Sequence, residues 1–442
     1  MFLVDSNALT KVQSVALIAI IAVAAVGGGA AYVFWSGTEQ STEAIKVGLT
    51  CDLDYYGGAE ALHAAELAAE QVNDAGGVIG RNFTIVAEDD DGTTGDISVA
   101  INAMTKLITV DKADYILTFG GAAAFSYQDI CSEQKKILVS ALSSADELSQ
   151  RVLDNYDKYK YYFSMMPNAT SGHDGWVDAL LTLRNYTGFN KVAYLDQDAA
   201  SFEKWRVSVC GTLAEYGFDV VYQGSATWTT GDFTSYFSAM EAAGAEILFA
   251  NIYLSAGASF VKEWYDRQSP VVIWGIVDQA SYHYFWDLTE GKCEYVSFSG
   301  LPTLAGYPLT NQTVPFRETY IERWNGEVPT WSGTLIYDFV RFILPDAIRR
   351  AGTTETEGVI KALEKTDVET TTARHFVFTS SHDVFIGMAG PNGPDVDYMM
   401  VLLFQWQNGV QVPVYPQEIL EEAGAAYKYP PWRGPWDNIQ TP

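Results

Sequence analysis

The stretch Leu62–Asp91, LHAAELAAEQVNDAGGVIGRNFTIVAEDDD, decides the fold that the rest of the chain follows. Its first half repeats small apolar residues at helical spacing and so predicts an amphipathic helix. The pair Gly76-Gly77 ends that helix, because glycine takes the positive φ that a helix C-terminus needs. Apolar residues within 83–86 then predict a short buried strand, which ends in the acidic run Glu88–Asp91.

This order of helix, Gly-Gly turn, strand and acidic turn follows another apparent strand, Ile45–Leu49. The pattern resembles the first lobe of the leucine/isoleucine/valine-binding family of ABC-transporter solute receptors, which are type I periplasmic binding proteins. The resemblance covers roughly residues 44–415. It implies an α/β fold of two doubly wound parallel-sheet lobes, joined by a three-strand hinge. A dinucleotide fingerprint is excluded, because its glycines open a helix and these close one.

Length and charge bound the class of protein further. A chain of 442 residues is long enough for two or more lobes, each with its own core. The formal net charge of −28 argues against nucleic acid as a partner, because the phosphates would be repelled. The charge suits a soluble, exposed domain.

The N-terminal region predicts a membrane segment. Val15–Phe34 carries no charge, and a bilayer-spanning helix needs roughly 20 apolar residues. We expect a transmembrane anchor or signal at 11–35, with its N-terminus inside the cell, and a linker at 36–43. A cleaved secretory signal and a pilin-type signal stay open as alternatives. Each version places the bulk of the chain outside the cytoplasm.

Sequons and cysteines bear on whether the bulk of the chain lies outside the cytoplasm. Four N-x-[S/T] sequons favour an extracytoplasmic surface; they begin at Asn82, Asn168, Asn185 and Asn311. The four cysteines form no C-x-x-C pair, so no zinc or redox motif is indicated. Two arrangements stay open: a disulfide within each lobe, or four buried free thiols. The cysteines are Cys51, Cys131, Cys210 and Cys293.

Strands and helices alternate along the chain, which predicts parallel sheets with helices on both faces. With the resemblance, this alternation gives limits for two lobes: lobe one at 44–163 with 303–368, and lobe two at 164–302 with 369–442. Three later elements are also expected. They are a strand at Cys293–Ser297, one helix over Trp331–Ala351 kinked at Pro345, and a strand at Tyr398–Trp406.

Two loops of lobe one match ligand-binding loops of the family. In one, backbone N–H groups and usually a serine hydroxyl hold a ligand carboxylate. Ala122 and Ala123 lie at that position here, and Ala123 stands where the serine is expected. The other loop resembles S-P-x-A-T-x-P-E-L: Ser144 falls on the threonine, Leu142 on a backbone contact, and Ser143 lies between them. Ser143 and Ser144 also suit a helix N-cap, so both roles stay open.

Aromatic and acidic residues complete the expected site. Tyr55 and Tyr56 match a family loop that walls the pocket, and surface packing is their alternative role. In lobe two, Asp278 follows a strand and is the candidate partner of a ligand ammonium, or it caps the next helix. Further candidates from the resemblance are Asn168, Phe202 and Tyr253.

The resemblance implies a solute receptor of an ABC importer that binds a small amino acid, or a related amide or organic acid. Its partners would be ABC permease subunits and, through the N-terminal helix, the membrane. The scattered histidines predict no metal site, and we expect no cofactor and no enzyme activity. Two alternatives stay open: a sensory or regulatory module, and a pilin-like structural subunit of the cell surface.

Overall fold

The computed structural model describes residues 43–54, 56–92, 96–121, 123–198, 200–253, 256–387 and 395–439. The expected anchor or signal at 11–35, and the expected linker except for its last residue, lie outside these ranges. Within the ranges, no helix has both the length and the apolar character that crossing a bilayer requires.

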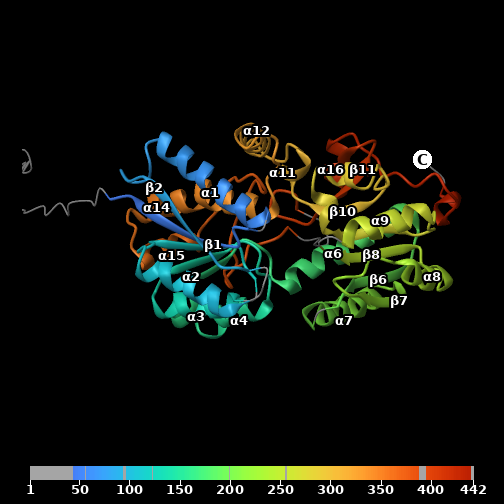
Figure 1. Cartoon of the computed structure of the whole chain (residues 1–442), viewed down its shortest axis with the longest axis horizontal. Helices are drawn as coiled ribbons and strands as arrows, with labels where there is room; N and C mark the ends of the chain where they lie inside the picture. The colour runs from blue at the N-terminus through green and yellow to red at the C-terminus, as the bar shows by residue number, and fades with distance from the viewer. Residues whose placement is uncertain are drawn as a thin grey trace, which may run out of the picture. The chain divides into compact units, whose positions relative to one another are not determined.

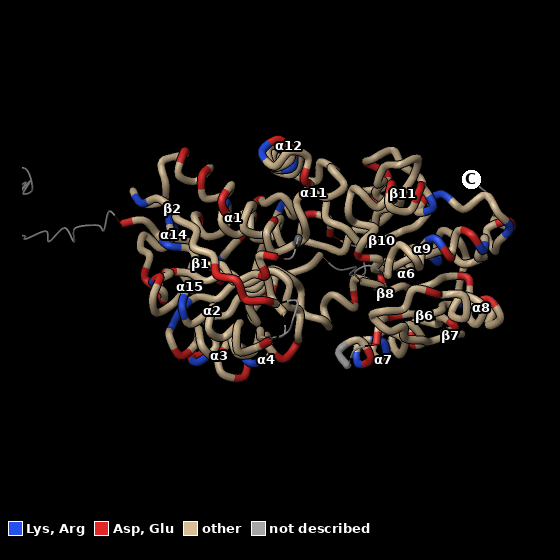
Figure 2. Tube along the Cα trace, in the orientation of Figure 1, with Lys and Arg blue, Asp and Glu red and all other residues tan. Residues whose placement is uncertain are grey.

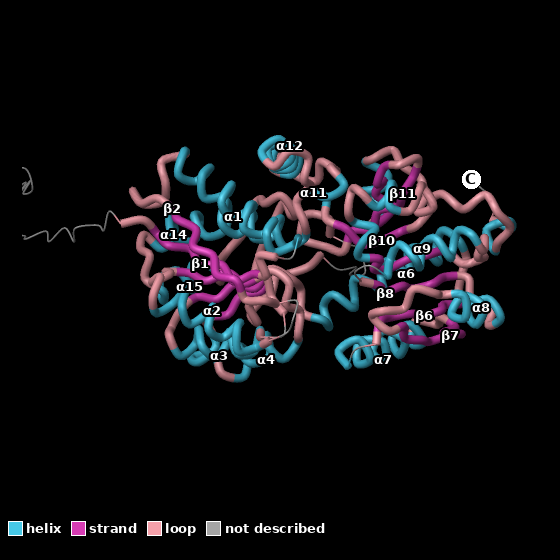
Figure 3. The backbone as a smooth tube through the Cα atoms, in the orientation of Figure 1, coloured by secondary structure: helices cyan, strands magenta, loops and turns pink. Residues whose placement is uncertain are grey.

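Five parallel strands form the first sheet, in the order β2-β1-β3-β4-β5. The register places Val47 of β1 beside Ile85 of β2 and Tyr115 of β3. We call this sheet and the helices packed on it lobe one (Figures 1 and 3). The strands are β1 (Ile45–Cys51), β2 (Phe83–Asp89), β3 (Tyr115–Thr118), β4 (Ile137–Ser140) and β5 (Tyr162–Ser164).

Helices cover both faces of this sheet, as the alternation predicts. Tyr115 and Leu117 of β3 pack in the same core as α1 and α13, whereas Ile116 packs with α2 and α3. Successive side chains of β3 point to opposite faces of the sheet, so the strand contributes to two cores. The helices are α1 (Tyr56–Asp74), α2 (Ile97–Thr109), α3 (Ala124–Glu133), α4 (Asp146–Asp154), α5 (Tyr156–Tyr159), α11 (Pro302–Ala305), α12 (Thr313–Arg323), α13 (Trp331–Asp338), α14 (Leu344–Ala351) and α15 (Thr356–Leu363).

The Gly-Gly turn between α1 and β2 has a specific geometry. Gly76 and Gly77 both have positive φ, at 94° and 72°. A Cβ on Gly77 would lie 2.3 Å from the carbonyl oxygen of Arg81, so the chain folds back too closely for a side chain there. The Asn73 amide bonds both backbone groups of Phe83, at 2.9 and 2.7 Å, and ties the helix end to β2. Figure 2 marks the acidic residues that follow in red.

Four parallel strands form the second sheet, in the order β7-β6-β8-β9. Phe249 of β8 packs against α6 and α7, while α8 and α9 pack on each other through Phe237 and Phe260. We call this sheet and its helices lobe two. The elements are β6 (Lys191–Gln197), β7 (Asp219–Ala226), β8 (Ile247–Ile252), β9 (Val272–Val277), α6 (Ala169–Thr187), α7 (Ala200–Glu215), α8 (Thr234–Ala242), α9 (Ala256–Asp266), η1 (Asp278–Ser281) and α10 (Phe285–Leu288).

A third, antiparallel sheet follows in the order β10-β11-β12. The strand expected at Cys293–Ser297 begins only at Ser297. The strand expected from Tyr398 begins only at Leu402, because Tyr398 and Met399 form isolated bridges and no continuous ladder. The elements are β10 (Ser297–Gly300), β11 (Leu402–Gln407), β12 (Val410–Tyr415), α16 (Gln417–Glu422) and η3 (Pro435–Asn438).

The helix expected over Trp331–Ala351 changes its type in the middle. It runs as α13, then as a π-helix at η2 (Phe339–Ile343), then as α14. Pro345 lies in the first turn of α14, where a missing N–H removes no bond from within that helix. The π turns therefore take up the irregularity that the sequence predicts as a kink at Pro345.

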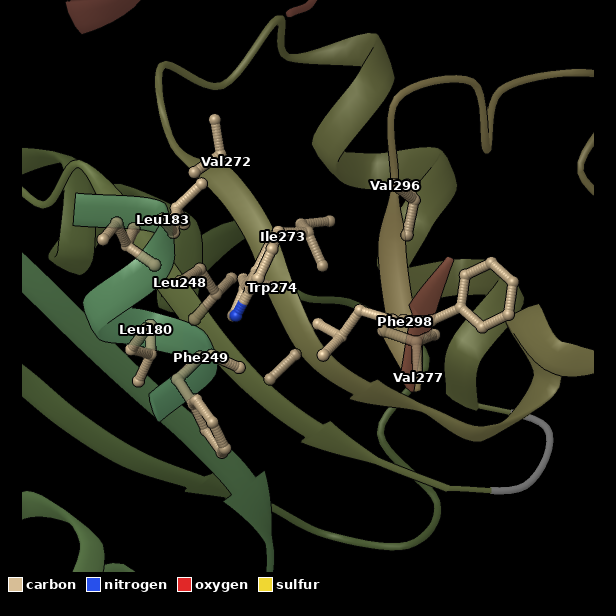
Figure 4. Packing of buried hydrophobic residues seen from close by; sticks show 14 of the residues in the cluster. Leu180, Leu183, Leu248, Phe249, Val272, Ile273, Trp274, Val277, Val296 and Phe298 are labelled. Carbon is tan, nitrogen blue, oxygen red and sulfur yellow. The ribbon is translucent and has the colours of Figure 1, made fainter. Parts of the chain in front are cut away.

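Each lobe has its own buried core. Figure 4 shows part of the lobe-two core, with Leu180 of α6, Phe249 of β8 and Trp274 of β9. The lobe-one core also contains apolar side chains from within the segment 369–442, namely Ala373, Phe376, Phe378, Val384 and Met399. The expected lobe limits remain a prediction, and these five side chains pack with lobe one.

The four cysteines are free and buried, as one of the two alternatives predicts. Burial raises the pKa of Cys51, Cys210 and Cys293 to about 12, and it raises the pKa of Cys131 as well. Because the thiolate is the reactive form, these thiols are protonated and unreactive at neutral pH.

Two segments that connect the lobes run side by side. Ser164, at the end of β5, donates its N–H to the carbonyl of His382 at 2.9 Å and accepts the N–H of Val384 at 3.0 Å. Asp383, between them, is buried and accepts hydrogen bonds from Ser149 and from the Asn168 amide. The crossover after β5 is therefore held by a chain segment more than 200 residues away.

Candidate functional site

A cavity of about 610 Å³ lies where the strands of both lobes end. In lobe one its lining comes from the residues after β3, β4 and β5, and in lobe two from the ends of β8 and β9. This is where doubly wound sheets bind ligands, because the loops there meet helix N-termini. Its volume is typical of small-molecule sites, which measure about 300–1,000 Å³.

Aromatic side chains form much of the wall. Phe202 and Tyr253 stack with ring centroids 5.3 Å apart. Trp176 and Trp205 both pack on Phe249 beneath them, at 5.3 and 5.9 Å. The aromatic residues that line the cavity are Phe119, Trp176, Phe202, Trp205, Tyr253, Tyr282 and Trp331.

Six of the residues expected in the site line this one cavity. Leu142 and Ser144 reach it from the loop after β4, and Asn168 from the crossover after β5. The others are Phe202, Tyr253 and Asp278, all from lobe two. The structure thus brings together candidates that lie as far apart in sequence as 142 and 278.

Two other candidates lie outside the cavity wall. Ala123 lines a small crevice with Asp90 and Tyr127 at the start of α3. Ser143 is held through its backbone: its N–H donates to the Ser140 hydroxyl at 3.0 Å, and its carbonyl accepts from the Ser164 hydroxyl at 2.9 Å. Tyr55, Ala122 and the side chain of Tyr56 lie outside the described residues.

The first turn of α6 points at the cavity, but its N–H groups are already bonded. Those of Ala169 and Thr170 donate to Ser144 O at 2.6 Å and to Asp146 Oδ1 at 2.9 Å. Those of Ser171 and Gly172 donate to the side chain and the backbone of Asn168, both at 2.9 Å. This helix start therefore keeps no spare donor for a ligand anion.

Asn168 uses both atoms of its amide for hydrogen bonds within the protein. Its Oδ1 caps α6, while its Nδ2 donates to Asp383 Oδ2 at 3.1 Å. Its place in the wall follows from holding α6 and the crossover together, which uses one of the two N–H groups of Nδ2.

Asp278 is the acidic group of the site. It opens η1 directly after β9, is half-buried, and lies close enough to Tyr253 to affect that phenol. Burial raises the pKa of Tyr253, and the negative charge of Asp278 raises it further. Among the described residues that line the cavity, Asp278 alone carries a formal charge.

Sequence reasoning missed several wall residues. Trp331 and Ser332 belong to the N-terminus of α13, which Thr330 caps by accepting the Gly333 N–H at 3.1 Å. Asn251, fully buried near the end of β8, also lines the cavity. Its position at the carboxyl end of a buried strand was the available signal, whereas nothing local connects Trp331 to lobe two.

Comparisons with known proteins agree with this geometry. A family model described as periplasmic binding protein matches residues 45–389. Leu/Ile/Val-binding protein homolog 3 of Brucella melitensis is 21% identical over 352 residues, which cover 78% of this chain and 86% of that protein.

Solved structures show the same fold. A protein from Silicibacter pomeroyi, assigned to branched-chain amino acid ABC transport, superposes with a TM-score of 0.77 at 18% identity, covering 88% of this chain and 100% of that one. The branched-chain amino acid transporter substrate-binding protein of Streptococcus pneumoniae, in complex with isoleucine, gives a TM-score of 0.67 at 17% identity, covering 84% and 100%.

Proposed function

This chain belongs to the periplasmic binding protein family, whose model matches residues 45–389, and from that premise we propose that it is the membrane-anchored solute receptor of an ABC importer. The resemblance inferred from the sequence is confirmed, and so is the α/β fold with parallel sheets. The proposal adds the ligand, the anchor and the partner.

The observation that carries the proposal is the cavity of about 610 Å³, lined by side chains from both lobes. A ligand that contacts Ser144 of lobe one and Asp278 of lobe two at once binds best when the lobes close on it. Closure by hinge motion around a ligand is how a two-lobed receptor signals that it is loaded. The work of the site is binding, without a chemical step.

We propose an amino acid, or a related amide or organic acid, as the ligand. The S. pneumoniae structure holds isoleucine, and the name of the Brucella relative includes leucine, isoleucine and valine. In this chain Asp278 is the group that would pair with a ligand ammonium, and Phe202 with Tyr253 would pack on its apolar part. The partners would be the permease subunits that receive the closed form.

We place the receptor outside the cytoplasm, held to the membrane by residues 11–35. Supports for this are the uncharged stretch Val15–Phe34 and the four sequons. Membrane fractionation of the native host, followed by N-terminal sequencing, tests the anchor. Protein in the soluble fraction that starts after residue 35 would contradict retention of the helix.

The ligand proposal is tested by native mass spectrometry of the full chain purified in detergent. A small molecule carried through purification would be released on denaturation and identified. Calorimetric titration with that compound is expected to give one site per chain. Absence of any carried ligand, together with no binding across a panel of amino acids, amides and organic acids, would contradict the receptor function.

A further inference from the structure

A group of buried polar atoms without hydrogen-bond partners lies in the carboxyl-terminal halves of β6 and β8. The atoms are Tyr194 Oη, Asp196 Oδ2, Gln197 Nε2 and both amide atoms of Asn251, and no described residue bonds any of them. An unpaired buried polar atom costs free energy, and native proteins leave few of them. Such a group at the edge where parallel sheets bind ligands indicates a site that an incoming group completes.

Asn251 connects this group of atoms to the cavity. It lines the cavity wall and is fully buried. The register pairs Tyr194 with Phe249, two residues before Asn251, and their rings stack at 5.2 Å on one face of the sheet. Side chains two residues apart along a strand share a face. The Asn251 side chain therefore points to the face on which the two wall tryptophans pack against Phe249.

The neighbours of Asn251 leave its amide unpaired. Asp196 uses Oδ1 to accept from Arg206 and Ser225, both at 2.6 Å, and its Oδ2 has no partner in the described chain. Burial raises the pKa of Tyr194, the charge of Asp196 raises it further, and the Asn251 amide opposes the rise, so these three side chains lie close together. No hydrogen bond joins Asn251 to either neighbour among the described atoms.

The chemistry of an amide defines the group that would complete this site. Asn251 offers one acceptor, Oδ1, and the two N–H donors of Nδ2. A primary carboxamide is its complement, because its N–H donates to Oδ1 while its oxygen accepts from Nδ2. A ketone or a carboxylate offers acceptors only and leaves Oδ1 unpaired. Both amide atoms are shielded from bulk water, which strengthens a hydrogen bond made there and raises the cost of leaving an atom unpaired.

We propose that Asn251 forms a specificity-determining subsite at the lobe-two end of the cavity, which binds a primary carboxamide of the ligand and prefers it to a ketone or a carboxylate of similar shape. The inference rests on the proposed function, because it takes this cavity as the ligand site. The contacts proposed above for Ser144 and Asp278 are separate from this one.

Three ligands with the same body isolate the amide N–H. The full chain in detergent is titrated calorimetrically with 3-phenylpropionamide, 4-phenylbutan-2-one and 3-phenylpropionate. The ketone replaces the amide nitrogen by a methyl group of similar size. The amide is expected to bind about tenfold or more tightly than the other two, because only the amide pairs both atoms of Asn251. A ketone or a carboxylate that binds as tightly as the amide overturns the proposal.

The variant Asn251→Leu, which replaces the amide by apolar atoms of similar size, tests the residue itself. It is expected to weaken 3-phenylpropionamide by about tenfold or more and to change the affinity for the ketone by less than about threefold. Asn185→Leu, at an exposed site in α6, is the matched control and is expected to change neither affinity. An unchanged amide affinity in Asn251→Leu overturns the subsite.

Stability without ligand separates a lost contact from a misfolded variant. Asn251→Leu removes two unpaired buried atoms, so its urea midpoint is expected to equal or exceed that of the native chain, whereas misfolding would lower it. A lower midpoint would show that the amide is already paired in the ligand-free protein, and it overturns the proposal.

The subsite and the receptor function fail separately. A solute carried through purification that binds the native chain and Asn251→Leu equally well rejects the subsite and leaves the receptor function standing. No carried solute, together with no binding of any of the three ligands, rejects both.

Discussion

Asp338 shows how a buried carboxyl makes this protein sensitive to pH. It is fully buried in α13 and accepts hydrogen bonds from the Thr371 N–H and the Thr372 hydroxyl, both at 2.9 Å. Burial raises the pKa of Asp338 to about 6, although these hydrogen bonds oppose the shift. The folded chain therefore holds this proton at a pH where the unfolded chain has released it.

The sign of the effect follows from that difference. Between the ordinary pKa of 3.8 and about 6, the folded state binds more protons, so rising pH destabilises it until about pH 6. We expect Asp338 to lower the free energy of unfolding by up to about 3 kcal/mol between pH 4 and pH 7, at 1.36 kcal/mol per pKa unit. Urea denaturation of the native chain and Asp338→Asn at both pH values measures this difference. A difference independent of pH would contradict it.

At the scale of elements, the turn between α1 and β2 sets where the first strand pair begins. Gly76 and Gly77 both have positive φ, but only Gly77 lies against backbone: a Cβ there would be 2.3 Å from Arg81 O, while Gly76 faces open space. The two glycines thus separate the cost of backbone strain from the cost of a steric clash. Both lie within the stretch from which the fold is predicted.

We expect Gly76→Ala to lower the free energy of unfolding by about 1–2 kcal/mol, from strain alone. Gly77→Ala should cost at least about 1 kcal/mol more, because the Arg81 carbonyl must also move. Denaturant titrations of the two variants, followed by tryptophan fluorescence, test the order. Equal losses of unfolding free energy in the two variants would show that the Arg81 carbonyl moves aside without additional cost.

How far the sequence predicts these elements depends on whether their partners are local. Strands β1 to β4 can be predicted from the alternation of strand and helix patterns, because turn residues flank each buried apolar run. The segment from Tyr398 is less predictable, since its first residues meet only isolated partners at His375 and Ile386. A hydrophobic run shows that residues are buried, but it does not show whether a neighbouring strand lies close enough to pair.

The site is predictable to a similar degree. Loops after β4, β5 and β9 can be placed in it, because parallel strands end at one edge. Within a loop the direction of each side chain is not given: Ser144 lines the cavity, whereas the Ser143 hydroxyl lies against Gly120. Trp331 enters from a helix that starts far along the chain, and only the tertiary fold brings it there.

At the scale of the whole molecule, the proposed ligand site and the crossover between the lobes share contacts. Ser144, which lines the cavity, also accepts the N–H of Ala169 at the start of α6, and Asn168 joins α6 to Asp383. These residues belong to the crossover between the lobes. Under the proposed function, we expect a ligand held at both Ser144 and Asp278 to pull on this crossover when the lobes close.

We expect a bound ligand to close the lobes and to stabilise the fold. Small-angle scattering should show a smaller radius of gyration on saturation. The free energy of unfolding should rise by about 2.7 kcal/mol at a ligand concentration of 100 Kd. Asp278→Asn at the same ligand concentration should show neither change. Stabilisation without compaction would indicate that the ligand binds an already closed form.

The protonated, buried thiols make this molecule convenient for spectroscopy. All four cysteines are at most 5% exposed, so maleimide dyes will leave the folded chain unlabelled. A pair of cysteines introduced at exposed positions, one in α3 and one in α8, would carry a donor and an acceptor without removal of any native cysteine. Energy transfer between the two dyes would then follow opening and closing in single molecules.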